Sequence, residues 1–450
     1  MASWRTMDVK ETMKKNIAKR FKPYPAYKDS GVEWLDEIPE GWRVKPVFAM
    51  YKRSKRINNP EEELLSVYRD YGVIPTSSRD DNFNKPSEDL STYQLVKPRD
   101  LVINKMKAWQ GSIAVSELTG IVSPAYHVYL AHHDENDRYI HYLMRSPIYA
   151  STFLRFSKGI RVNQWDLEPE SFSHLHILLP TNLEQYFIIT YLDREATRID
   201  ALLTKYQILL DLLKEKRSAL ISKAVTKGLD PNVPMRDSGV EWLGKIAQAW
   251  NVRRIKYIIH LNPRSLSENT NPNYIFQYID IGSVDNKGSY LPSQEISFES
   301  APSRARRVIS EGDIIISTVR TYLRAIALIK KNDIPQVAST GFAVLRCKDY
   351  IEPRFLQFAL SAPYFIDKVV ANSEGIGYPS INESLMSSFN IVYPSIKEQI
   401  AIVDFLNCET AKIDSLVAKV ERAVELLKEY RVALISAAVT GKIDLREESA

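Results

Sequence analysis

Two stretches decide the architecture of this chain: residues 181–226, TNLEQYFIITYLDREATRIDALLTKYQILLDLLKEKRSALISKAVT, and residues 395–440, SIKEQIAIVDFLNCETAKIDSLVAKVERAVELLKEYRVALISAAVT. Each follows a proline and opens with Thr or Ser, with Glu three residues later. This spacing is typical of a capping box, in which the two side chains satisfy the free amides of a helix start. The sequence therefore predicts two long helices that begin at Thr181 and Ser395.

Apolar residues recur at heptad spacing in both stretches, at equivalent positions. The predicted seam consists of Ile199, Leu202, Tyr206, Leu209, Leu213 and Leu220 in the first stretch and of Ile413, Leu416, Val420, Leu427 and Leu434 in the second. About forty helical residues at about 1.5 Å each make a rod on the order of 60 Å, which cannot bury such a stripe alone. We expect the two helices to pair as a coiled coil. The alternative is two core helices of separate domains.

Composition limits the class of protein. With 450 residues, of which 44% are apolar, the chain is long enough for two or three domains. Its formal net charge of +5 permits a polyanionic partner without requiring one. The two cysteines, Cys347 and Cys408, lack metal-site spacing and favour a reducing cytosol. Because no apolar run approaches a membrane span and residues 1–20 lack the apolar core of a signal peptide, we expect a soluble cytoplasmic protein.

The heptapeptide DSGVEWL occurs twice, at residues 29–35 and 237–243, and a second tryptophan, Trp42 or Trp250, follows each copy in register. Such an identity indicates an internal duplication. It divides the chain into an N-terminal extension (1–23), a first globular domain (24–180), a first helix (181–230), a second globular domain (231–394) and a second helix with the C-terminal tail (395–450).

Short β-prone runs, turn signals and one helical run make up each globular domain. The predicted strands are residues 64–68, 100–104, 111–115 and 127–130 in the first domain and 278–281, 312–316 and 342–345 in the second, with helical runs at 138–156 and 354–370. Both domains are therefore predicted to be α+β.

The two copies agree in their frame and differ in two loops. Residues 105–111 correspond to 317–324, and residues 158–165 correspond to 374–382. These loops combine charged or amide side chains with aromatic residues, which suits phosphate contacts by Lys and Arg and base-edge contacts by Gln, Arg or Thr. The alternative for any single loop is an ordinary solvated surface. The candidate DNA-binding residues are Lys105, Lys107, Trp109, Gln110, Lys158, Arg161, Asn163, Gln164, Arg320, Tyr322, Arg324, Tyr378, Ser380 and Asn382.

The repeated capped helices ending in Ala-Leu-Ile-Ser, each behind a globular domain with its tryptophan and a Pro-x-x-x-Glu-Gln motif, resemble the specificity subunit of type I restriction-modification systems. The resemblance covers nearly the whole chain beyond residue 24, and the N-terminal extension before it departs from the pattern of that family. It implies that each globular domain is a target recognition domain that reads one half of a bipartite site in double-stranded DNA. It also implies that the helices are spacers, and that the partners are two modification (methyltransferase) subunits and two restriction (motor-nuclease) subunits.

Motifs for catalysis by the chain itself are missing from the sequence. It has no phosphate-binding loop, and its nearest approach to the Asn/Asp-Pro-Pro-aromatic loop of an adenine methyltransferase, residues 271–274, lacks the second proline. No acidic motif of a Mg²⁺ nuclease is present. The histidines at 132–133 and at 174 and 176 lack zinc-site spacing. We expect no cofactor in this chain, with S-adenosylmethionine, ATP and Mg²⁺ held by partner subunits.

We therefore predict a non-catalytic reader of DNA with two α+β recognition domains separated by an antiparallel helix pair. The antiparallel direction follows from the local two-fold symmetry of duplex DNA, because two similar domains approach one face most simply about a dyad. The competing interpretations are a self-sufficient DNA-modifying enzyme, which the missing motifs oppose, and a coiled-coil scaffold without DNA specificity, which the two large domains oppose.

Overall fold

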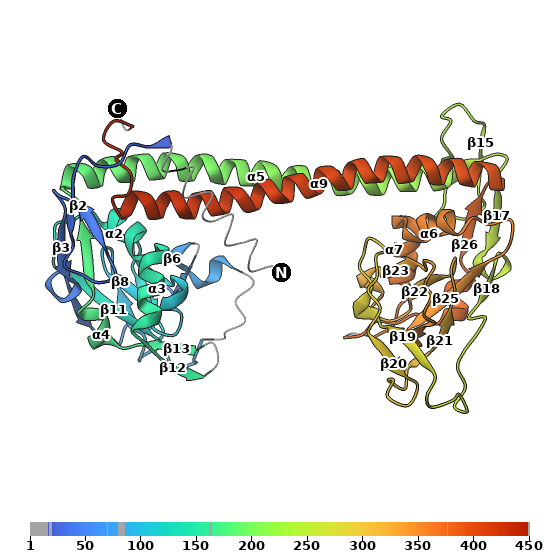
Figure 1. Ribbon diagram of the computed structural model, residues 1–450, viewed down its shortest axis with the longest axis horizontal. Coiled ribbons are helices and arrows are strands. Elements are labelled where there is room, and N and C mark those ends of the chain that lie inside the picture. The colour runs from blue at the N-terminus through green and yellow to red at the C-terminus, as the bar shows by residue number, and fades with distance from the viewer. Residues whose placement is uncertain are drawn as a thin grey trace. The chain divides into compact units, whose positions relative to one another are not determined.

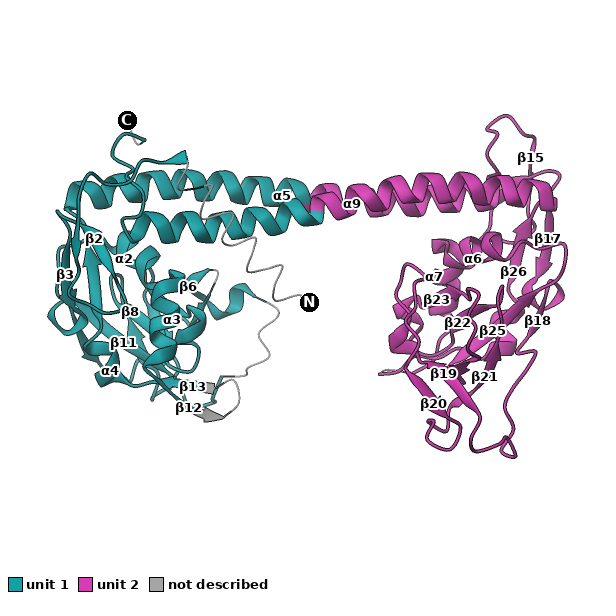
Figure 2. Cartoon of the chain, in the orientation of Figure 1, with its two compact units in different colours: residues 1–206, 421–450 teal, residues 207–420 magenta. Residues whose placement is uncertain are grey.

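The computed structural model describes residues 17, 20–69, 71–79, 86–161, 164–375 and 377–448, without the side chains of residues 160, 161 and 164. The chain divides into two compact units, unit 1 (1–206 with 421–450) and unit 2 (207–420), shown in Figure 2. Two long helices, α5 (Asn182–Lys227) and α9 (Ile396–Val439), each contribute residues to both units (Figure 1). The two predicted long helices are thus confirmed.

The start of α5 is a complete capping box. The Glu184 amide donates to the Thr181 hydroxyl at 3.3 Å, and the Glu184 carboxylate accepts from the amide and the hydroxyl of Thr181 at 3.1 and 2.7 Å. These bonds satisfy amides that have no partner inside the helix. At the start of α9 the Glu398 amide donates to the Ser395 hydroxyl at 3.4 Å. Both helices therefore begin where the sequence predicted.

Unit 1 is built on a four-stranded antiparallel sheet in the order β4–β11–β8–β9. Its strands are β4 (Tyr51–Ser54), β8 (Leu101–Asn104), β9 (Ile113–Val115) and β11 (Tyr126–Ala131). Two-stranded ladders surround it: β1 (Tyr27–Asp29) with β2 (Glu37–Pro39), β3 (Arg43–Pro46) with β14 (His176–Leu179), β5 (Leu65–Tyr68) with β6 (Gly72–Pro75), β7 (Gln94–Val96) with β10 (Gly120–Val122), and β12 (Ser157–Arg161) with β13 (Gln164–Leu167). In β8, Leu101 and Ile103 belong to one core cluster and Val102 to another, so both faces of the sheet are covered.

Unit 2 repeats this frame. Its sheet has the order β18–β25–β22–β23, formed by β18 (Ile259–Leu261), β22 (Ile314–Ser317), β23 (Ile326–Leu328) and β25 (Phe342–Cys347). Two ladders correspond to the first two ladders of unit 1: β15 (Met235–Asp237) with β16 (Lys245–Ala247), and β17 (Asn251–Arg254) with β26 (Asn390–Tyr393). A second sheet, β20–β19–β24–β21, is formed by β19 (Ile275–Ile279), β20 (Glu295–Ser297), β21 (Ala305–Ile309) and β24 (Gln336–Ser339). The strand predicted at 278–281 is β19, which begins earlier than predicted. It also ends earlier, because Asp280 caps the short helix that follows.

Each predicted helical run is two helices, which corrects the prediction of one. Residues 138–156 form α2 (Asp137–Met144) and α3 (Pro147–Arg155), and residues 354–370 form α6 (Pro353–Ser361) and α7 (Pro363–Ala371). Both breaks fall at a proline. Because the proline ring disfavours helical geometry at the residue before it, Ser146 and Ala362 are extended, with ψ of 152° and 141°.

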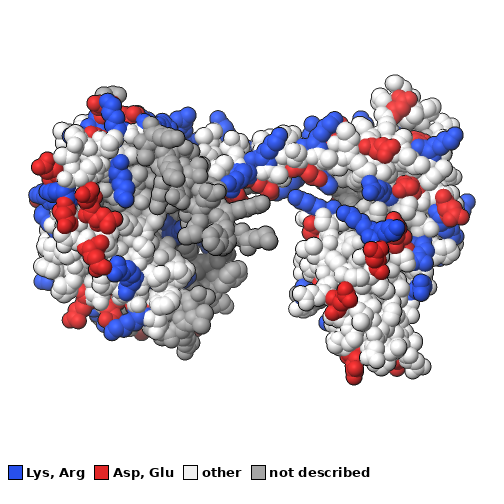
Figure 3. Space-filling model, viewed as in Figure 1, with Lys and Arg blue, Asp and Glu red and all other residues white. Residues whose placement is uncertain are grey.

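Helices α5 and α9 pair antiparallel within each unit, as predicted. In unit 1 Arg431 donates to Asp200 at 2.8 Å, and in unit 2 Arg217 donates to Asp414 at 3.1 Å. The early part of each helix thus faces the late part of the other. On the face of the pair seen in Figure 3, Lys and Arg side chains are interspersed with Asp and Glu. Neither of these helices, nor any other in the described part of the chain, has the apolar content that crossing a membrane needs.

The helix seam differs from the predicted one at its intermediate positions. Most predicted residues are buried or half-buried: Ile199, Leu202, Tyr206, Leu213, Leu220, Ile413, Val420, Leu427 and Leu434. Leu209 and Leu416, however, are 40% and 48% exposed, while their neighbours Leu210 and Val417 are each 8% exposed. The prediction of Leu209 and Leu416 was wrong, because the seam advances four residues after Tyr206 and after Ile413 rather than three. Adjacent apolar residues at these points fit either spacing.

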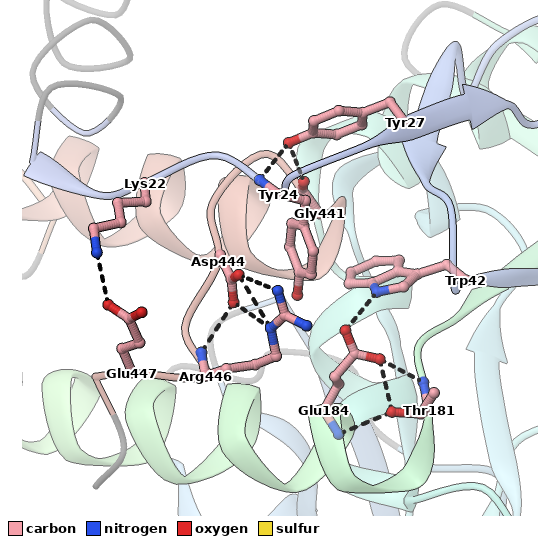
Figure 4. Close-up of polar contacts among 10 residues, drawn as sticks. All are labelled: Lys22, Tyr24, Tyr27, Trp42, Thr181, Glu184, Gly441, Asp444, Arg446 and Glu447. Carbon is pink, nitrogen blue, oxygen red and sulfur yellow. Dashed lines mark hydrogen bonds and ion pairs between the residues drawn. The ribbon is translucent and has the colours of Figure 1, made fainter.

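The end of the N-terminal extension packs onto unit 1 beside the C-terminal tail. Ile17 and Phe21 are buried, and the Phe21 ring meets Tyr191 of α5 edge-on at 5.8 Å. The Lys22 carbonyl accepts from the Asp444 amide at 2.8 Å, and the Lys22 ammonium pairs with Glu447 at 2.9 Å (Figure 4). These contacts give Ile17, Phe21 and Lys22 a structural role that the sequence did not indicate.

Unit 1 encloses three histidines. Burial, reinforced by nearby Arg145, lowers the pKa of His141 to about 3, and burial with nearby Arg53 lowers that of His127 to about 4. Burial also lowers the pKa of His133. No group of three or more His, Cys, Asp or Glu side chains that could hold a metal ion occurs among the described residues.

We predict that Leu210→Ala destabilises the helix pair and that Leu209→Ala does not. The two residues are neighbours of the same type, but only the Leu210 side chain is removed from water. Truncating a buried leucine costs about 2–5 kcal/mol, so the free energy of unfolding in urea should fall only for Leu210→Ala. Equal effects of the two substitutions would show that the seam is assigned incorrectly.

We predict that acid destabilises unit 1 before unit 2. The three lowered histidine pKa values mean that the unfolded state binds protons more readily than the folded state below the unfolded pKa of about 6.5. Stability is therefore complete above that pH and falls as the pH drops toward 4. Unit 2 contains one histidine, His260, which is exposed. Amide hydrogen exchange at pH 7 and pH 4.5, corrected for intrinsic rates, should show larger loss of protection in unit 1; equal loss in both units would contradict this.

Candidate nucleic-acid interface

A buried tryptophan ties the start of each long helix to its domain. In unit 1 the Trp42 indole N–H donates to the Glu184 carboxylate at 3.2 Å, and the same carboxylate completes the capping box (Figure 4). In unit 2 the Trp250 indole N–H donates to Glu398 at 3.1 Å. Both bonds join a residue near the beginning of a domain to the first turn of the helix that follows it.

The glutamine after each of these glutamates forms a second clamp. The side-chain carbonyl of Gln185 accepts from the Asn136 amide at 2.9 Å, and its amide group donates to the Pro180 carbonyl at 3.1 Å. Gln399 repeats both bonds with Glu352 and Pro394, at 2.8 and 3.0 Å. The Pro-x-x-x-Glu-Gln motif at the start of each long helix is therefore a structural joint that orients each domain on its helix.

In unit 2 the two variable loops form one surface. Val319, just beyond β22, pairs with Ser380 of the second loop as an antiparallel bridge. The Arg320 amide donates to the Pro379 carbonyl at 2.7 Å, and the Arg320 guanidinium lies 4.4 Å from the centroid of the Tyr378 ring. Arg320, Tyr378 and Ser380, which the sequence singled out separately, are thus brought together.

Two arginines of this surface have left-handed backbones. The short helix η6 (Thr321–Leu323) lies between Arg320, with φ of 52°, and Arg324, with φ of 54°. This conformation costs a residue other than glycine about 1–2 kcal/mol. At the equivalent end of η3 (Ala108–Gln110) in unit 1, Gly111 takes the left-handed position with φ of 85°. Because Arg324 is exposed and strained where glycine would be relaxed, its side chain is a candidate for a functional role.

In unit 1 the loop after β8 is joined to the β12–β13 hairpin. The Leu167 amide donates to the Lys105 carbonyl at 3.1 Å. Lys107 and Gln110 are exposed, whereas Trp109 is half-buried and its indole N–H donates to the carbonyl of Met106 within the same loop, at 3.2 Å. Lys107 and Gln110 therefore face solvent, and Trp109 shapes the loop.

The remaining candidate DNA-binding residues differ in their contacts and exposure. Lys158 forms an ion pair with Glu168 at 2.7 Å. The Asn382 side chain caps α8 (Glu383–Ser387) by accepting from the Ser384 amide at 2.8 Å, and Tyr322 is 54% exposed. The side chains of Arg161, Asn163 and Gln164 lie outside the described residues. DNA contact by any of these residues stays a prediction.

Sequence reasoning missed a half-buried polar cluster in unit 2. Arg307 of β21 pairs with Glu383 at 3.0 Å, and Glu383 also accepts from the Asn262 side chain at 2.5 Å. Asn262 in turn accepts from the Val344 amide at 2.8 Å. The cluster ties the two sheets to α8, at the end of the second variable loop. The sequence shows Arg304, Arg306 and Arg307 as a basic cluster, but the partners Glu383 and Asn262 lie far from it in the chain.

Comparison with known proteins identifies the relatives of this chain. Residues 248–424 match the family model of the type I restriction modification DNA specificity domain. The chain is 21% identical to the MjaVIII specificity subunit of Methanocaldococcus jannaschii, over 91% of this chain and 94% of that one, and 21% identical to the EcoKI specificity subunit of Escherichia coli K12, over 90% of each. It is 27% identical to the StySPI specificity subunit of Salmonella potsdam over a shorter match, which spans 30% of each chain.

Two solved structures share the fold. One is a chain from work on complex assembly and conformational transition of the type I R-M system, with a TM-score of 0.68 and 16% identity over 89% of this chain and 98% of that one. The other is the HsdS subunit of Thermoanaerobacter tengcongensis, with a TM-score of 0.50 and 16% identity over 90% of this chain and 98% of that one. The predicted fold, two α+β domains joined by long helices, is confirmed, and so is the resemblance that the sequence indicated.

Proposed function

We propose that this chain, which carries a type I restriction-modification DNA specificity domain and resembles specificity subunits along nearly its whole length, reads the two halves of a bipartite DNA target and directs partner subunits to it. Each unit reads one half-site with its pair of variable loops. The observation that carries the proposal is the duplication: the same strand order and the same tryptophan joint support loops whose residues differ. Reading two unlike sequences requires a common frame with different contact residues.

The chemistry of the loops suits DNA. Lys107 in unit 1 and Arg324 in unit 2 are exposed cations that can contact phosphates or guanine edges. Gln110 can bind adenine through both the carbonyl oxygen and the NH2 group of its side-chain amide. The Arg320 guanidinium, held over the Tyr378 ring, is restricted in orientation and so loses less conformational freedom when it binds.

The helix pair offers a face for the partner subunits. On α5, Ile208, Leu209 and Leu212 are 54%, 40% and 56% exposed, and their spacing places them on one side of the helix. A row of exposed large apolar side chains is typical of a protein interface. We propose that modification subunits, two in the complete assembly, dock along the helix pair, and that two restriction subunits join them.

The proposal assigns no catalytic step to this chain. Its loops present cations, amides and aromatic rings, which bind DNA, and its sequence lacks the motifs for methyl transfer, ATP hydrolysis and Mg²⁺-dependent cleavage. S-adenosylmethionine, ATP and Mg²⁺ would be held by the partners. Methyl transfer by the purified chain alone would favour the competing interpretation of a self-sufficient enzyme.

One substitution in each unit tests whether each unit reads one half-site. Gln110→Ala should relax the base preference of one half-site, and Arg324→Gly should relax that of the other, each by about 1–3 kcal/mol for the base concerned. Glycine is unstrained at φ of 54°, so Arg324→Gly should leave the thermal unfolding temperature unchanged or raise it. Selection of bound sequences from a random duplex library, with the full chain and its modification subunits, gives both preferences in one measurement.

The readout separates three outcomes. Loss at different half-sites for the two variants supports the proposal. Loss spread equally over both half-sites would reject the assignment of one unit to each, and a wild-type complex that selects no sequence at all would favour a scaffold without DNA specificity.

A further inference from the structure

A polar cleft of about 620 Å³ opens in unit 1 beside the η3 loop. The β5–β6 ladder and its turn contribute Tyr68 and Arg69 to the lining, and the η3 loop contributes Lys107 and Gln110. The cleft thus joins the predicted DNA-binding loop to a ladder that no sequence motif had connected with function.

The described lining of the cleft is positively charged. Arg69, Arg79 and Lys107 line it, and none of its described lining residues carries a carboxylate. Arg69 and Lys107 are exposed, while the Arg79 guanidinium lies over the rings of Tyr68 and Tyr71, at 5.1 and 4.9 Å from their centroids. A concave surface lined by charges of one sign concentrates the potential inside it, so the cations of the described lining favour an anion there.

The rest of the lining is neutral and polar. The half-buried Tyr126 lines the cleft together with Ser66 and Asn104, and the hydroxyls of Ser66 and Thr76 lie 2.9 Å apart. Hydroxyl and amide groups both donate and accept hydrogen bonds. They therefore suit the oxygens of a sugar–phosphate chain better than an apolar ligand.

The shape of the cleft selects which part of a duplex it can take. Base edges lie at the bottom of the grooves and are reached by elements that project into them. The sugar–phosphate backbones are the ridges that border the grooves. A cation-lined recess next to a loop therefore matches one backbone ridge beside the groove that the loop enters.

We propose that this cleft holds the sugar–phosphate backbone of one DNA strand, with Arg69 and Lys107 each contacting a phosphate, and so sets the register in which Gln110 meets the bases. The inference rests on the proposed function of unit 1 as a half-site reader. It makes Arg69 a positioning residue. Contacts of this kind add affinity for every sequence and carry no base preference of their own.

The test measures the salt dependence of binding. The full chain with its modification subunits is titrated with a duplex that carries the selected site and with an unrelated duplex, at several salt concentrations. The slope of log Kobs against log salt is negative, and each lost phosphate contact reduces its magnitude by about 0.9, so the double variant Arg69→Ala with Lys107→Ala should reduce the magnitude by about 1.8 on both duplexes. The ratio of the two affinities should stay unchanged.

Two further variants control for charge and folding. Lys28→Ala removes an exposed cation of unit 1 that does not line the cleft, and it should leave the slope unchanged. Arg69→Lys keeps the charge and should retain the wild-type slope. Two results would overturn the proposed backbone contact if the wild type still selects its site. One is an unchanged slope in the double variant, and the other is an equal reduction of the slope's magnitude in the Lys28→Ala control. A wild type without sequence preference would instead reject the proposed function itself.

Discussion

The hydrogen bond from a buried indole to a glutamate in the first turn of a long helix is the contact on which the rest of this structure depends. It is made by Trp42 with Glu184 and again by Trp250 with Glu398. A hydrogen bond to a charged group is worth about 1.5–3 kcal/mol, and losing one partner leaves a buried donor or carboxylate unsatisfied. In unit 1 the same carboxylate also closes the capping box, so helix start and domain attachment are one feature. The glutamine that follows adds backbone contacts and fixes the helix direction.

This joint separates what must stay constant from what can vary. The tryptophan, the glutamate and the glutamine are the same in both units, whereas the loops after β8 and β22 differ in sequence between the units. In unit 2 the loop keeps two left-handed arginines, a strain that the frame can bear because the strands on both sides are buried. Contact chemistry can therefore change in one unit without disturbing the other, which suits a protein that reads two different half-sites.

The sequence was sufficient to predict the features that depend on local or repeated residue patterns. The capping residues, the duplicated heptapeptide and most seam residues predicted the helices and the two-domain plan. Leu209 and Leu416 were assigned wrongly because each has an apolar neighbour that fits a heptad equally well. The meeting of Arg320 with Tyr378, and the cleft between β5 and η3, depend on chain segments far apart in sequence, and no local spacing encodes them. The role of Phe21 and Lys22 was missed for the same reason, because their partners lie in α5 and in the C-terminal tail.

The central claim is that two similar units, each tied to its helix by the same joint, read two half-sites of one target. Mapping methylated bases across the genome of a host that carries this chain and its modification subunits tests it most directly. The account predicts one bipartite motif, with two specified segments of different sequence separated by an unspecified spacer of constant length, that disappears when this chain is deleted. A single continuous motif, or a motif that persists without this chain, would contradict it.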